Sequence, residues 1–300
     1  MPDILEHLIY PFRRPRPPEP KTPMGFFTDT TLCIGCKACE VACKQWNQIP
    51  SDGFNFTGVS YDNTITLSAT TWRHVTFVEQ FPANGHRDTL PVPRANPADR
   101  TIDIDAILRE PKGGRWLMMS DVCKHCSTAP CQLSCPTGAI IVNEFSDIYI
   151  QNDICNGCGY CVAACPFGVI TRSNSDGHAH KCTLCFDRQR DGMSPACAKA
   201  CPTASIQFGP IEELRARAHQ RVEDLAARGV TDAYLYGDAP TDRYSSLHAF
   251  FLLTDTPSRY GLPNHPEIPQ RHIAGDYLRS AFGTAVWIAV LLIALLAHAI

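Results

Sequence analysis

The chain has 300 residues, a formal net charge of −3 and 44% hydrophobic residues, so it is long enough for two small packed domains. The weakly acidic balance argues against a nucleic-acid partner held through phosphate contacts. Its 16 cysteines are the outlying feature, and a secreted disulfide scaffold is normally a much shorter chain.

Residues 1–23 contain seven prolines and no apolar run, which predicts an extended or disordered tail. The pair Arg13-Arg14 resembles the start of a twin-arginine signal, but prolines follow where an apolar segment is required. The patterned sequence begins at Met24, which is therefore an alternative start.

Residues 24–122 contain the first cysteine motif, and we expect them to form the first half of a ferredoxin-like unit one with an inserted strand and loop. The spacing is C-x2-C-x2-C-x3-C, with Cys33, Cys36, Cys39 and Cys43. Lys44 stands where the other motifs have proline, which favours a longer helix here.

The insertion in that segment has three parts. Residues 64–79 alternate and are rich in β-branched and aromatic side chains, which predicts a strand. Residues 82–114 are rich in Pro, Gly and charge, which predicts a loop. The sequence "RWLMMSD" then predicts a short strand that leads into the second motif.

Residues 123–180 hold the second and third motifs, and we expect them to form unit two. The second motif has the spacing C-x2-C-x4-C-x3-C-P, with Cys123, Cys126, Cys131 and Cys135. The third has the spacing C-x2-C-x2-C-x3-C-P, with Cys155, Cys158, Cys161 and Cys165. Between them, "AII" and "DIYI" predict a small hairpin, the usual connection in ferredoxins.

Residues 181–210 hold the fourth motif and should complete unit one. The spacing is C-x2-C-x11-C-x3-C-P, with Cys182, Cys185, Cys197 and Cys201, so every cysteine belongs to a motif. Basic residues lie in or beside the motifs: Lys37, Lys124, His125, His178, His180 and Lys181. Such groups raise the reduction potential of a nearby cluster, but they equally suit a solvated surface or a backbone hydrogen bond.

Residues 211–280 predict a helix, a strand and a connector. In the helix, 211–228, one face is apolar and Gly229 provides the C-cap: Ile211, Leu214, Ala218, Val222 and Leu225. We interpret its charges as a solvated face: Arg215, Arg217, Arg221 and Glu223. "HAFFLL" at 248–253 predicts a strand, and 259–272 is a proline-rich connector.

Residues 281–300 form the predicted transmembrane helix. From Phe282 to Ile300 the chain has 19 residues without Asp, Glu, Lys or Arg, which meets the length and composition of a membrane span. A buried core helix is the alternative.

The cysteine spacing has a geometric reason. Three thiolates on a short loop can wrap one face of a cubane, and the fourth, three residues later, points away and ligates a second cluster. Zinc needs two ligands from each of two loops and has no use for the third and fourth cysteines. Disulfides would be strained and would leave the x3 spacing unexplained. The motifs therefore predict four [4Fe–4S] clusters, and no catalytic nucleophile or phosphate loop is visible.

Spacing alone leaves the pairing of motifs open. Adjacent pairing would join the first motif with the second and the third with the fourth. Nested pairing would join the first with the fourth and the second with the third. The predicted hairpin between the second and third motifs favours the nested arrangement.

Several stretches resemble the beta subunit of membrane-bound formate dehydrogenases: "GFFTDTTLCIGCKACEVACKQWN", "CNGCGYCVAACPFGV", "KCTLCFDR" with "PACAKACPTASIQFG", and the late "YGLP". The likeness runs from about Gly25 to the terminal helix. The cysteine framework alone is typical of a wider class, the four-cluster subunits of molybdopterin oxidoreductases. The implied fold is α+β, with two ferredoxin-like 2[4Fe–4S] units and one C-terminal transmembrane helix.

The resemblance also implies which cysteines share a cluster. Cluster 1 takes Cys33, Cys36, Cys39 and Cys201, and cluster 2 takes Cys182, Cys185, Cys197 and Cys43. Cluster 3 takes Cys123, Cys126, Cys131 and Cys165, and cluster 4 takes Cys155, Cys158, Cys161 and Cys135. In some relatives the second motif lacks a cysteine and holds a three-iron cluster, but here it is complete.

The implied partners are a catalytic alpha subunit with a molybdenum or tungsten pterin, which oxidises formate, and a membrane cytochrome b gamma subunit that passes electrons to quinone. Unit one should lie toward alpha and unit two toward the cytochrome. The protein is then a non-catalytic, single-pass subunit in the inner membrane of a prokaryote. Arg271, His272 and Arg279 before the helix favour a cytoplasmic body. Export of the folded complex on the partner's signal overrides this bias, so we expect the body on the periplasmic face, with the cytoplasmic face as the alternative.

Two alternatives stay open. The protein could be the equivalent subunit of another molybdopterin oxidoreductase or of a hydrogenase, which only the partner's substrate would distinguish. More distantly, it could be a zinc-structured membrane scaffold without a redox role.

Overall fold

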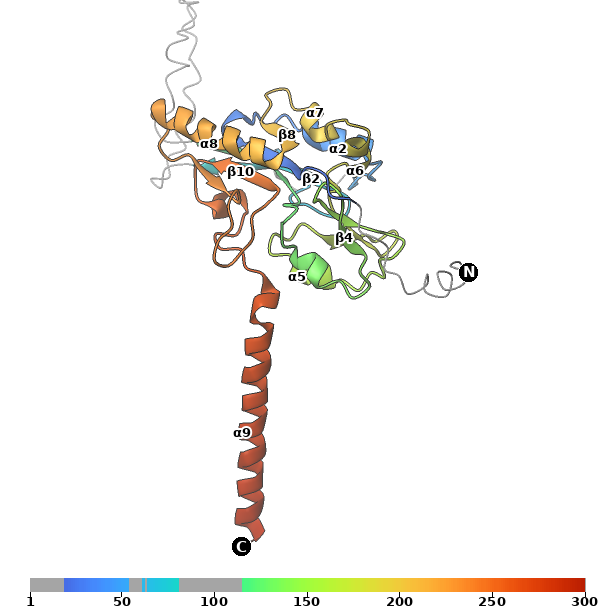
Figure 1. Ribbon diagram of the computed structural model, residues 1–300, viewed down its shortest axis with the longest axis vertical. Helices are drawn as coiled ribbons and strands as arrows, with labels where there is room; N and C mark the ends of the chain where they lie inside the picture. The colour runs from blue at the N-terminus through green and yellow to red at the C-terminus, as the bar shows by residue number, and fades with distance from the viewer. Residues whose placement is uncertain (1–18, 54–60, 63, 81–114, 300) are drawn as a thin grey trace, which may run out of the picture.

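A computed structural model describes residues 19–53, 61, 62, 64–80 and 115–299 of the chain (Figure 1). The described residues form a body of short helices and small sheets, from which one long helix, α9, projects (Figure 1). The N-terminal part of the predicted tail and the predicted loop 82–114 lie outside the described residues.

The largest sheet of the described residues has the strand order β8-β1-β10-β9. The strands are β1 (Met24–Asp29), β8 (Ile206–Pro210), β9 (Tyr234–Tyr236) and β10 (Ala249–Leu253). β1 is parallel to β10 and antiparallel to β8, with Phe27 opposite Phe250. β10 is buried along its whole length, which confirms the strand predicted at 248–253 and places the core of the body here.

Helix α8 (Ile211–Ala227) packs on β1 and β8. Four of its five predicted apolar residues are buried and Val222 is partly buried against them, so the predicted face is confirmed. Gly229 follows with φ +89°, the left-handed conformation that ends a helix. The interpretation of the charged face as solvated is wrong for Arg221, whose Nε donates to the buried Asp29 carboxylate at 2.8 Å.

A second sheet is the hairpin of β2 (Arg73–Gln80) and β3 (Arg115–Val122), which confirms the strand predicted from "RWLMMSD". The strand predicted over 64–79 is wrong in its first half, because β2 begins only at Arg73. Asp62 accepts hydrogen bonds from the backbone of Thr64 and Ile65, and Ile65 has φ +67°, which no strand allows. Local side-chain hydrogen bonds therefore override the β-branched composition.

Around the second and third motifs the elements follow each other closely. They are α4 (Pro130–Leu133), β4 (Ile140–Val142), β5 (Ile148–Ile150), α5 (Tyr160–Ala164), β6 (Thr171–Arg172) and β7 (Ala179–His180). β4 and β5 are antiparallel, with Ile140 opposite Ile150, which confirms the predicted hairpin. α4 and α5 pack on each other.

Around the first and fourth motifs lie η2 (Thr30–Leu32), α2 (Ala38–Trp46), α6 (Phe186–Arg190) and α7 (Ala196–Lys199). α2 packs on α7 although the two are about 150 residues apart in the chain. α2 runs three residues past Cys43, whereas α4, α5 and α7 each end before the fourth cysteine of their motif. The longer helix expected from Lys44 is confirmed.

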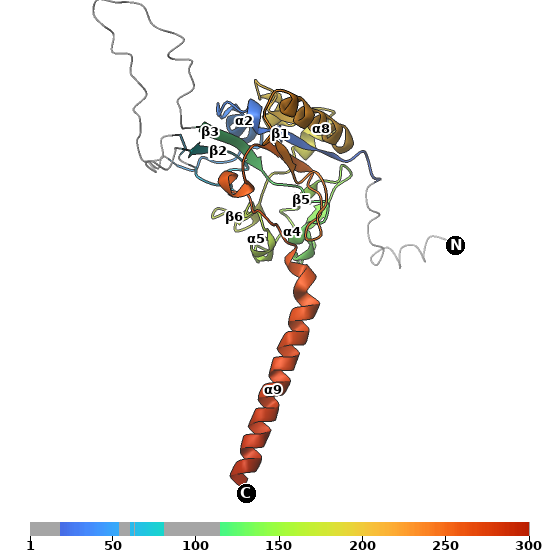
Figure 2. The ribbon, with the colours of Figure 1, turned by 90° about the vertical axis from the view of Figure 1, so that its left-hand side faces the viewer.

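The connector contains two short 3-10 helices, η3 (Pro257–Tyr260) and η4 (Pro269–His272). α9 (Ile273–Ala299) begins eight residues before the predicted start at 281, so the connector is shorter than expected. Within α9, Gly275–Leu295 is 21 residues long with a mean hydropathy of 2.0 and none of it is buried. Figure 2 shows α9 leaving the body beside α4 and α5, and Gln270 donates to the Pro130 carbonyl at 3.1 Å.

Candidate metal centres

The four C-x-x-C loops share one backbone feature. The residue just before the second cysteine has a positive φ in each motif: Gly35 (65°), His125 (42°), Gly157 (70°) and Leu184 (56°). Such a residue turns the loop sharply and directs successive N–H groups to the same side, which makes a concave site for negative charge. His125 and Leu184 hold this conformation without glycine, at a cost of about 1–2 kcal/mol each.

A second shared feature follows the fourth cysteine of three motifs. The residue three positions later has a positive φ: Gly138 (69°), Gly168 (63°) and Ala204 (53°). Its N–H donates back to the cysteine carbonyl, at 3.2–3.4 Å. The proline in between cannot continue the helix, so the chain turns away directly after placing the thiol.

Three cavities of nearly equal size are each lined by four cysteines. The first, of about 290 Å³, has Cys33, Cys36, Cys39 and Cys201. The second, of about 310 Å³, has Cys123, Cys126, Cys131 and Cys165. The third, of about 300 Å³, has Cys135, Cys155, Cys158 and Cys161. The equal sizes and identical donor sets indicate the same kind of occupant in all three.

The remaining cysteines are Cys43, Cys182, Cys185 and Cys197, and all four are buried. Burial raises the pKa of Cys185 to about 11, and the charge on Cys197 adds to the increase. Burial also raises the pKa of Cys43, and Cys197 and Cys185 add to the increase. These thiols must therefore be gathered closely, and they would lose their protons only when a metal centre binds them.

Cysteines of one group also raise the thiol pKa values of cysteines in another group, which indicates which groups are neighbours. The pKa of Cys39 is raised to about 11 by burial, with a contribution from Cys197. The pKa of Cys182 is raised by burial, with a contribution from Cys123. The pKa of Cys131 is raised to about 12 by burial, with a contribution from Cys161. Contacts join two of the same pairs, since Ser120 and Arg73 link Cys39 to Cys197 and α4, which carries Cys131, packs on α5, which carries Cys161. In this order the four groups form a row from the Cys39 group to the Cys161 group.

Burial changes along this row. The two inner groups hold eight cysteines. Seven of them are buried, and Cys165 is partly exposed. Each outer group instead has one exposed cysteine, Cys36 at one end and Cys158 at the other. The row therefore reaches the surface at both ends and is shielded in the middle.

Within the described residues, no three Cys, His, Asp or Glu side chains are arranged around a point that suits a single metal ion. Instead, each of the three cavities described above is lined by four cysteines. Four thiolates around a space of this kind are the ligand set of an iron–sulfur cluster.

Comparison with known proteins agrees with this chemistry. Two family models described as 4Fe-4S dicluster domains match residues 32–139 and 114–211. The formate dehydrogenase iron–sulfur subunit of Haemophilus influenzae is 38% identical over 85% of this chain and 73% of its own length. The formate dehydrogenase-O iron–sulfur subunit of Escherichia coli is 39% identical over 81% of this chain and 71% of its own.

The chain belongs to the family of formate dehydrogenase iron–sulfur subunits. This confirms the resemblance seen in the sequence. As in the rest of the family, the chain serves electron transfer, and its 16 cysteines provide for four [4Fe–4S] clusters. A more distant relative belongs to the anaerobic dimethyl sulfoxide reductase of Escherichia coli. It is 30% identical over 69% of this chain and 80% of its own length.

Several side chains of this iron–sulfur subunit contact cysteine sulfurs although they lie outside the cysteine motifs. Tyr244 Oη donates to Cys126 Sγ at 3.0 Å, and Arg73 Nη2 donates to Cys197 Sγ at 3.2 Å. Both partners are more than 100 residues away in the chain, so no local pattern could have revealed the contacts. A weak signal existed after the fourth cysteine: in "CPT", Thr137 and Thr203 lie within 3.6 and 3.8 Å of the sulfurs of Cys135 and Cys201.

The basic residues found in the sequence divide into two kinds. Lys124, His125 and Lys181 are buried. Burial alone would lower the pKa of Lys181, but cysteines of both inner groups, Cys123, Cys131 and Cys182, raise it. Lys37 and His180 instead lie nearer the surface and pair with Asp62 and Asp176, both at 2.8 Å.

Proposed function

We propose that this chain conducts electrons from a formate-oxidising subunit, which holds molybdenum or tungsten on a pterin, to a cytochrome b and quinone in the membrane. The observation that carries the proposal is the row of four cysteine groups with exposed thiols at its two ends. When bound, the clusters supply one-electron carriers along this row, and the chain itself positions and shields them.

The proposed ligand sets follow the cysteine groups described above. Cluster 1 is held by Cys33, Cys36, Cys39 and Cys201, and cluster 2 by Cys43, Cys182, Cys185 and Cys197. Cluster 3 is held by Cys123, Cys126, Cys131 and Cys165, and cluster 4 by Cys135, Cys155, Cys158 and Cys161. The three cysteine-lined cavities support clusters 1, 3 and 4. The mutual effects on the thiol pKa values of Cys43 and Cys185 support cluster 2. In this scheme the first and fourth motifs form unit one, and the second and third form unit two.

The proposed direction rests on where α9 leaves the body. Figure 2 shows α4 and α5, which carry cysteines of unit two, beside the start of α9. Unit two then faces the membrane and the cytochrome, and unit one faces the catalytic subunit. Exposed apolar residues surround both ends, Ile34 and Val41 at one and Ile154 and Tyr160 at the other, which suits contact with partner subunits.

We further propose that α9 anchors the chain in the inner membrane of a prokaryote. Its 21-residue apolar stretch is long enough to cross the hydrocarbon core, and it packs on nothing within the described chain.

We assign the body to the periplasmic face, through export of the folded complex on a signal carried by the catalytic partner. Labelling of the body with a membrane-impermeant reagent in intact spheroplasts would test this; protection of the body would contradict it.

The similarity to a dimethyl sulfoxide reductase subunit favours one second candidate, the same relay in another molybdopterin oxidoreductase. Co-purification distinguishes the two. The protein is tagged in its host and the complex is solubilised gently. Formate-dependent dye reduction should elute with the tagged, brown fractions. An intact complex that holds the clusters but does not respond to formate would refute the formate assignment and leave the relay in place.

The zinc-scaffold alternative has its own outcome in the same preparation. Iron–sulfur proteins absorb broadly through charge transfer from thiolate to iron. A colourless protein with stoichiometric zinc would refute the relay altogether.

A further inference from the structure

Arg73, the first residue of β2, is buried next to two cysteine groups. Its side chain is 1% exposed, the largest fully buried side chain among the described residues. Nη2 donates to Cys197 Sγ at 3.2 Å. Nη1 donates to the Ser120 carbonyl at 3.2 Å and to Ser120 Oγ at 3.3 Å.

Ser120 extends this contact to a second sulfur, because its Oγ lies 3.2 Å from Cys39 Sγ. One guanidinium group therefore touches Cys197 directly and Cys39 through a single hydroxyl. These two cysteines belong to different proposed clusters, Cys39 to cluster 1 and Cys197 to cluster 2. The contact lies where the two cysteine groups approach each other.

Arg73 keeps its charge although it is buried, because a guanidinium group is not deprotonated in proteins. On its other side the guanidinium lies over the ring of Phe26, 4.8 Å from the centroid, a favourable cation–π arrangement. Arg73 is thus a permanent positive charge in a site shielded from water.

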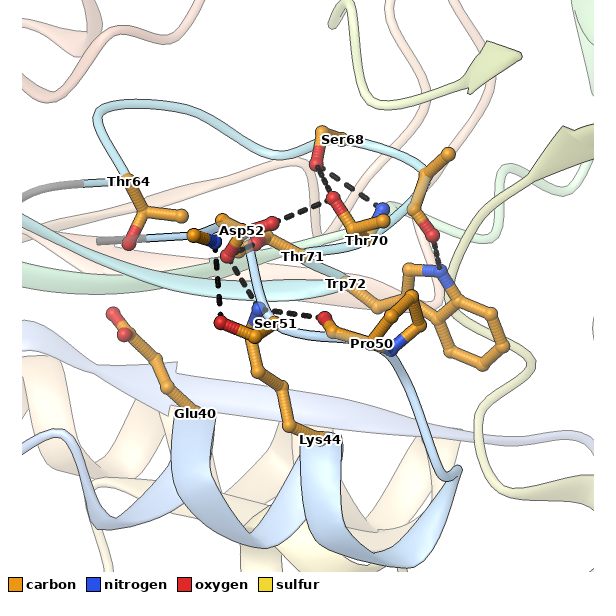
Figure 3. Close-up of polar contacts among 12 residues, drawn as sticks. Glu40, Lys44, Pro50, Ser51, Asp52, Thr64, Ser68, Thr70, Thr71 and Trp72 are labelled. Carbon is orange, nitrogen blue, oxygen red and sulfur yellow. Dashed lines mark hydrogen bonds and ion pairs between the residues drawn. The ribbon is translucent and has the colours of Figure 1, made fainter. Parts of the chain in front are cut away.

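The segment before β2 holds Arg73 in this place. Figure 3 shows Asp52 accepting hydrogen bonds from Thr70 (2.6 Å) and Thr71 (2.8 Å) and forming an ion pair with Lys44 of α2. Trp72, directly before Arg73, donates from Nε1 to the Ala69 carbonyl at 2.8 Å. Since Lys44 stands where the other motifs have proline, the feature that lengthens α2 also ties it to the turn that presents Arg73.

Other buried cations of the described residues are bonded differently. Lys124 donates to Asp121 and to the Val122 carbonyl, and Lys181 donates to the carbonyls of Ile148 and Cys182. Among the described residues, Arg73 is the cationic side chain that donates a hydrogen bond to a cysteine sulfur.

We propose that Arg73, with Ser120, sets and couples the reduction potentials of clusters 1 and 2. Reduction adds a negative charge to the cluster, so a cation that is hydrogen-bonded to its ligating sulfurs stabilises the reduced form. The inference rests on the proposed ligand sets and deepens the proposed function, because it names the residue that matches the first two carriers in energy.

The test is an EPR-monitored redox titration of the intact complex. The variants are Arg73→Gln, Arg73→Lys and Ser120→Ala, and the control is Arg217→Gln on the exposed surface of α8. Signals are assigned beforehand by their loss in Cys36→Ser for cluster 1 and in Cys185→Ser for cluster 2. Iron and sulfide are measured in every preparation.

We expect Arg73→Gln to weaken the one-electron reduction of clusters 1 and 2 at least tenfold each, a fall of about 59 mV in midpoint potential. Clusters 3 and 4 should not change. Arg73→Lys keeps the charge but not the forked geometry, so its effect should be smaller. Ser120→Ala should lower the potential of cluster 1 alone, and Arg217→Gln should change none.

Unchanged potentials in Arg73→Gln at full iron content would overturn the inference, as would an equal shift of all four clusters. If Arg73→Gln loses iron, Ser120→Ala and Arg73→Lys test the inference instead. Unchanged reduction potentials in both variants would then overturn the inference. Absence of four reducible clusters in the unaltered complex would instead refute the proposed function.

Discussion

The two proposed units, one and two, hold the same number of thiols but would be built in different ways. The eight cysteines of unit two lie within residues 123–165, and the β4–β5 hairpin and the α4–α5 pair hold them with local contacts. The cysteines of unit one come from two segments almost 140 residues apart between Cys43 and Cys182. Their meeting depends on α2 packing on α7 and on β1 pairing with β8.

This difference shows that unit one relies on a scaffold. Its elements α2, η2 and α7 pack on strands of the β2–β3 hairpin and of the four-stranded sheet. The ion pair of Arg221 with Asp29 joins α8 to the residues just before the first motif. Long-range closure costs chain entropy that only such packing can offset. Substitutions that compare unit two, held by local contacts, with unit one, held by long-range contacts, therefore test the proposed ligand sets best.

The largest expected effect comes from cysteine pairs that are distant in sequence. Cys201→Ser and Cys36→Ser should remove the same EPR signal, because we assign both to cluster 1. Cys201→Ser and Cys197→Ser should remove different signals although they are four residues apart. In unit two, Cys165→Ser should match Cys126→Ser and differ from Cys161→Ser. Identical losses for Cys201→Ser and Cys197→Ser would contradict the nested scheme.

A glycine change should show how tightly the first motif is packed. Gly35 has φ +65°, and a Cβ there would lie 2.5 Å from Phe77 Cε1 and 2.8 Å from Met118 Sδ. Gly35→Ala should therefore lose cluster 1, as measured by iron content and EPR. Gly168→Ala in unit two is the matched control, because its Cβ meets nothing within 4 Å and Ala204 already holds alanine at the corresponding position. Equal effects of the two changes would show that the contact with the hairpin is unimportant.

Asp147 in unit two should make stability depend on pH. Burial raises its pKa to about 7, against hydrogen bonds from Gln189 and Asn143 that lower it. An unfolded Asp titrates near 3.9, so between pH ~4 and ~7 the unfolded state releases its proton first and stability falls as pH rises. Above pH ~7 the full cost, on the order of a few kcal/mol, is present.

Asp147→Asn should remove that slope and raise the thermal midpoint at pH 8. The measurement is the loss of cluster absorbance on heating at pH 5 and pH 8, with Asp153→Asn on the exposed loop as the control. A variant that keeps the slope of the unaltered protein would show that Asp147 does not cause it.

The smallest expected effect concerns hydroxyl groups near sulfur. Tyr244 donates to Cys126 at 3.0 Å in a buried site, whereas Thr137 lies 3.6 Å from the partly exposed Cys135. Tyr244→Phe should lower the potential of cluster 3 by tens of millivolts, since a hydrogen bond to a charged group contributes about 1.5–3 kcal/mol at most. Thr137→Ala should lower that of cluster 4 by less. A larger shift in Thr137→Ala would contradict the role of burial.

Much of the arrangement could be predicted from sequence because it is local. The cysteine spacing, the hairpin between the second and third motifs and the apolar face of α8 each depend on residues a few positions apart. The strand predicted over 64–79 began too early because hydrogen bonds from one carboxylate, Asp62, stabilise a turn in a β-branched sequence.

The contacts at sulfur could not be predicted, because folding brings Arg73 and Tyr244 to cysteines that are 124 and 118 residues away. The solvated interpretation of Arg221 failed for the same reason, since Asp29 lies 192 residues before it. The sequence indicates which residues carry the chemistry, and the tertiary packing decides which of them adjust it.

Cryo-electron microscopy of the anaerobically purified complex is the most direct test of the account. Our account predicts four cubane densities in a row. Cys201 should bind the same density as Cys36, and Cys43 should bind the same density as Cys185. It also predicts that the row ends near α9 at the cluster of Cys158. Fewer densities, or one density that binds cysteines of the first and second motifs together, would contradict it.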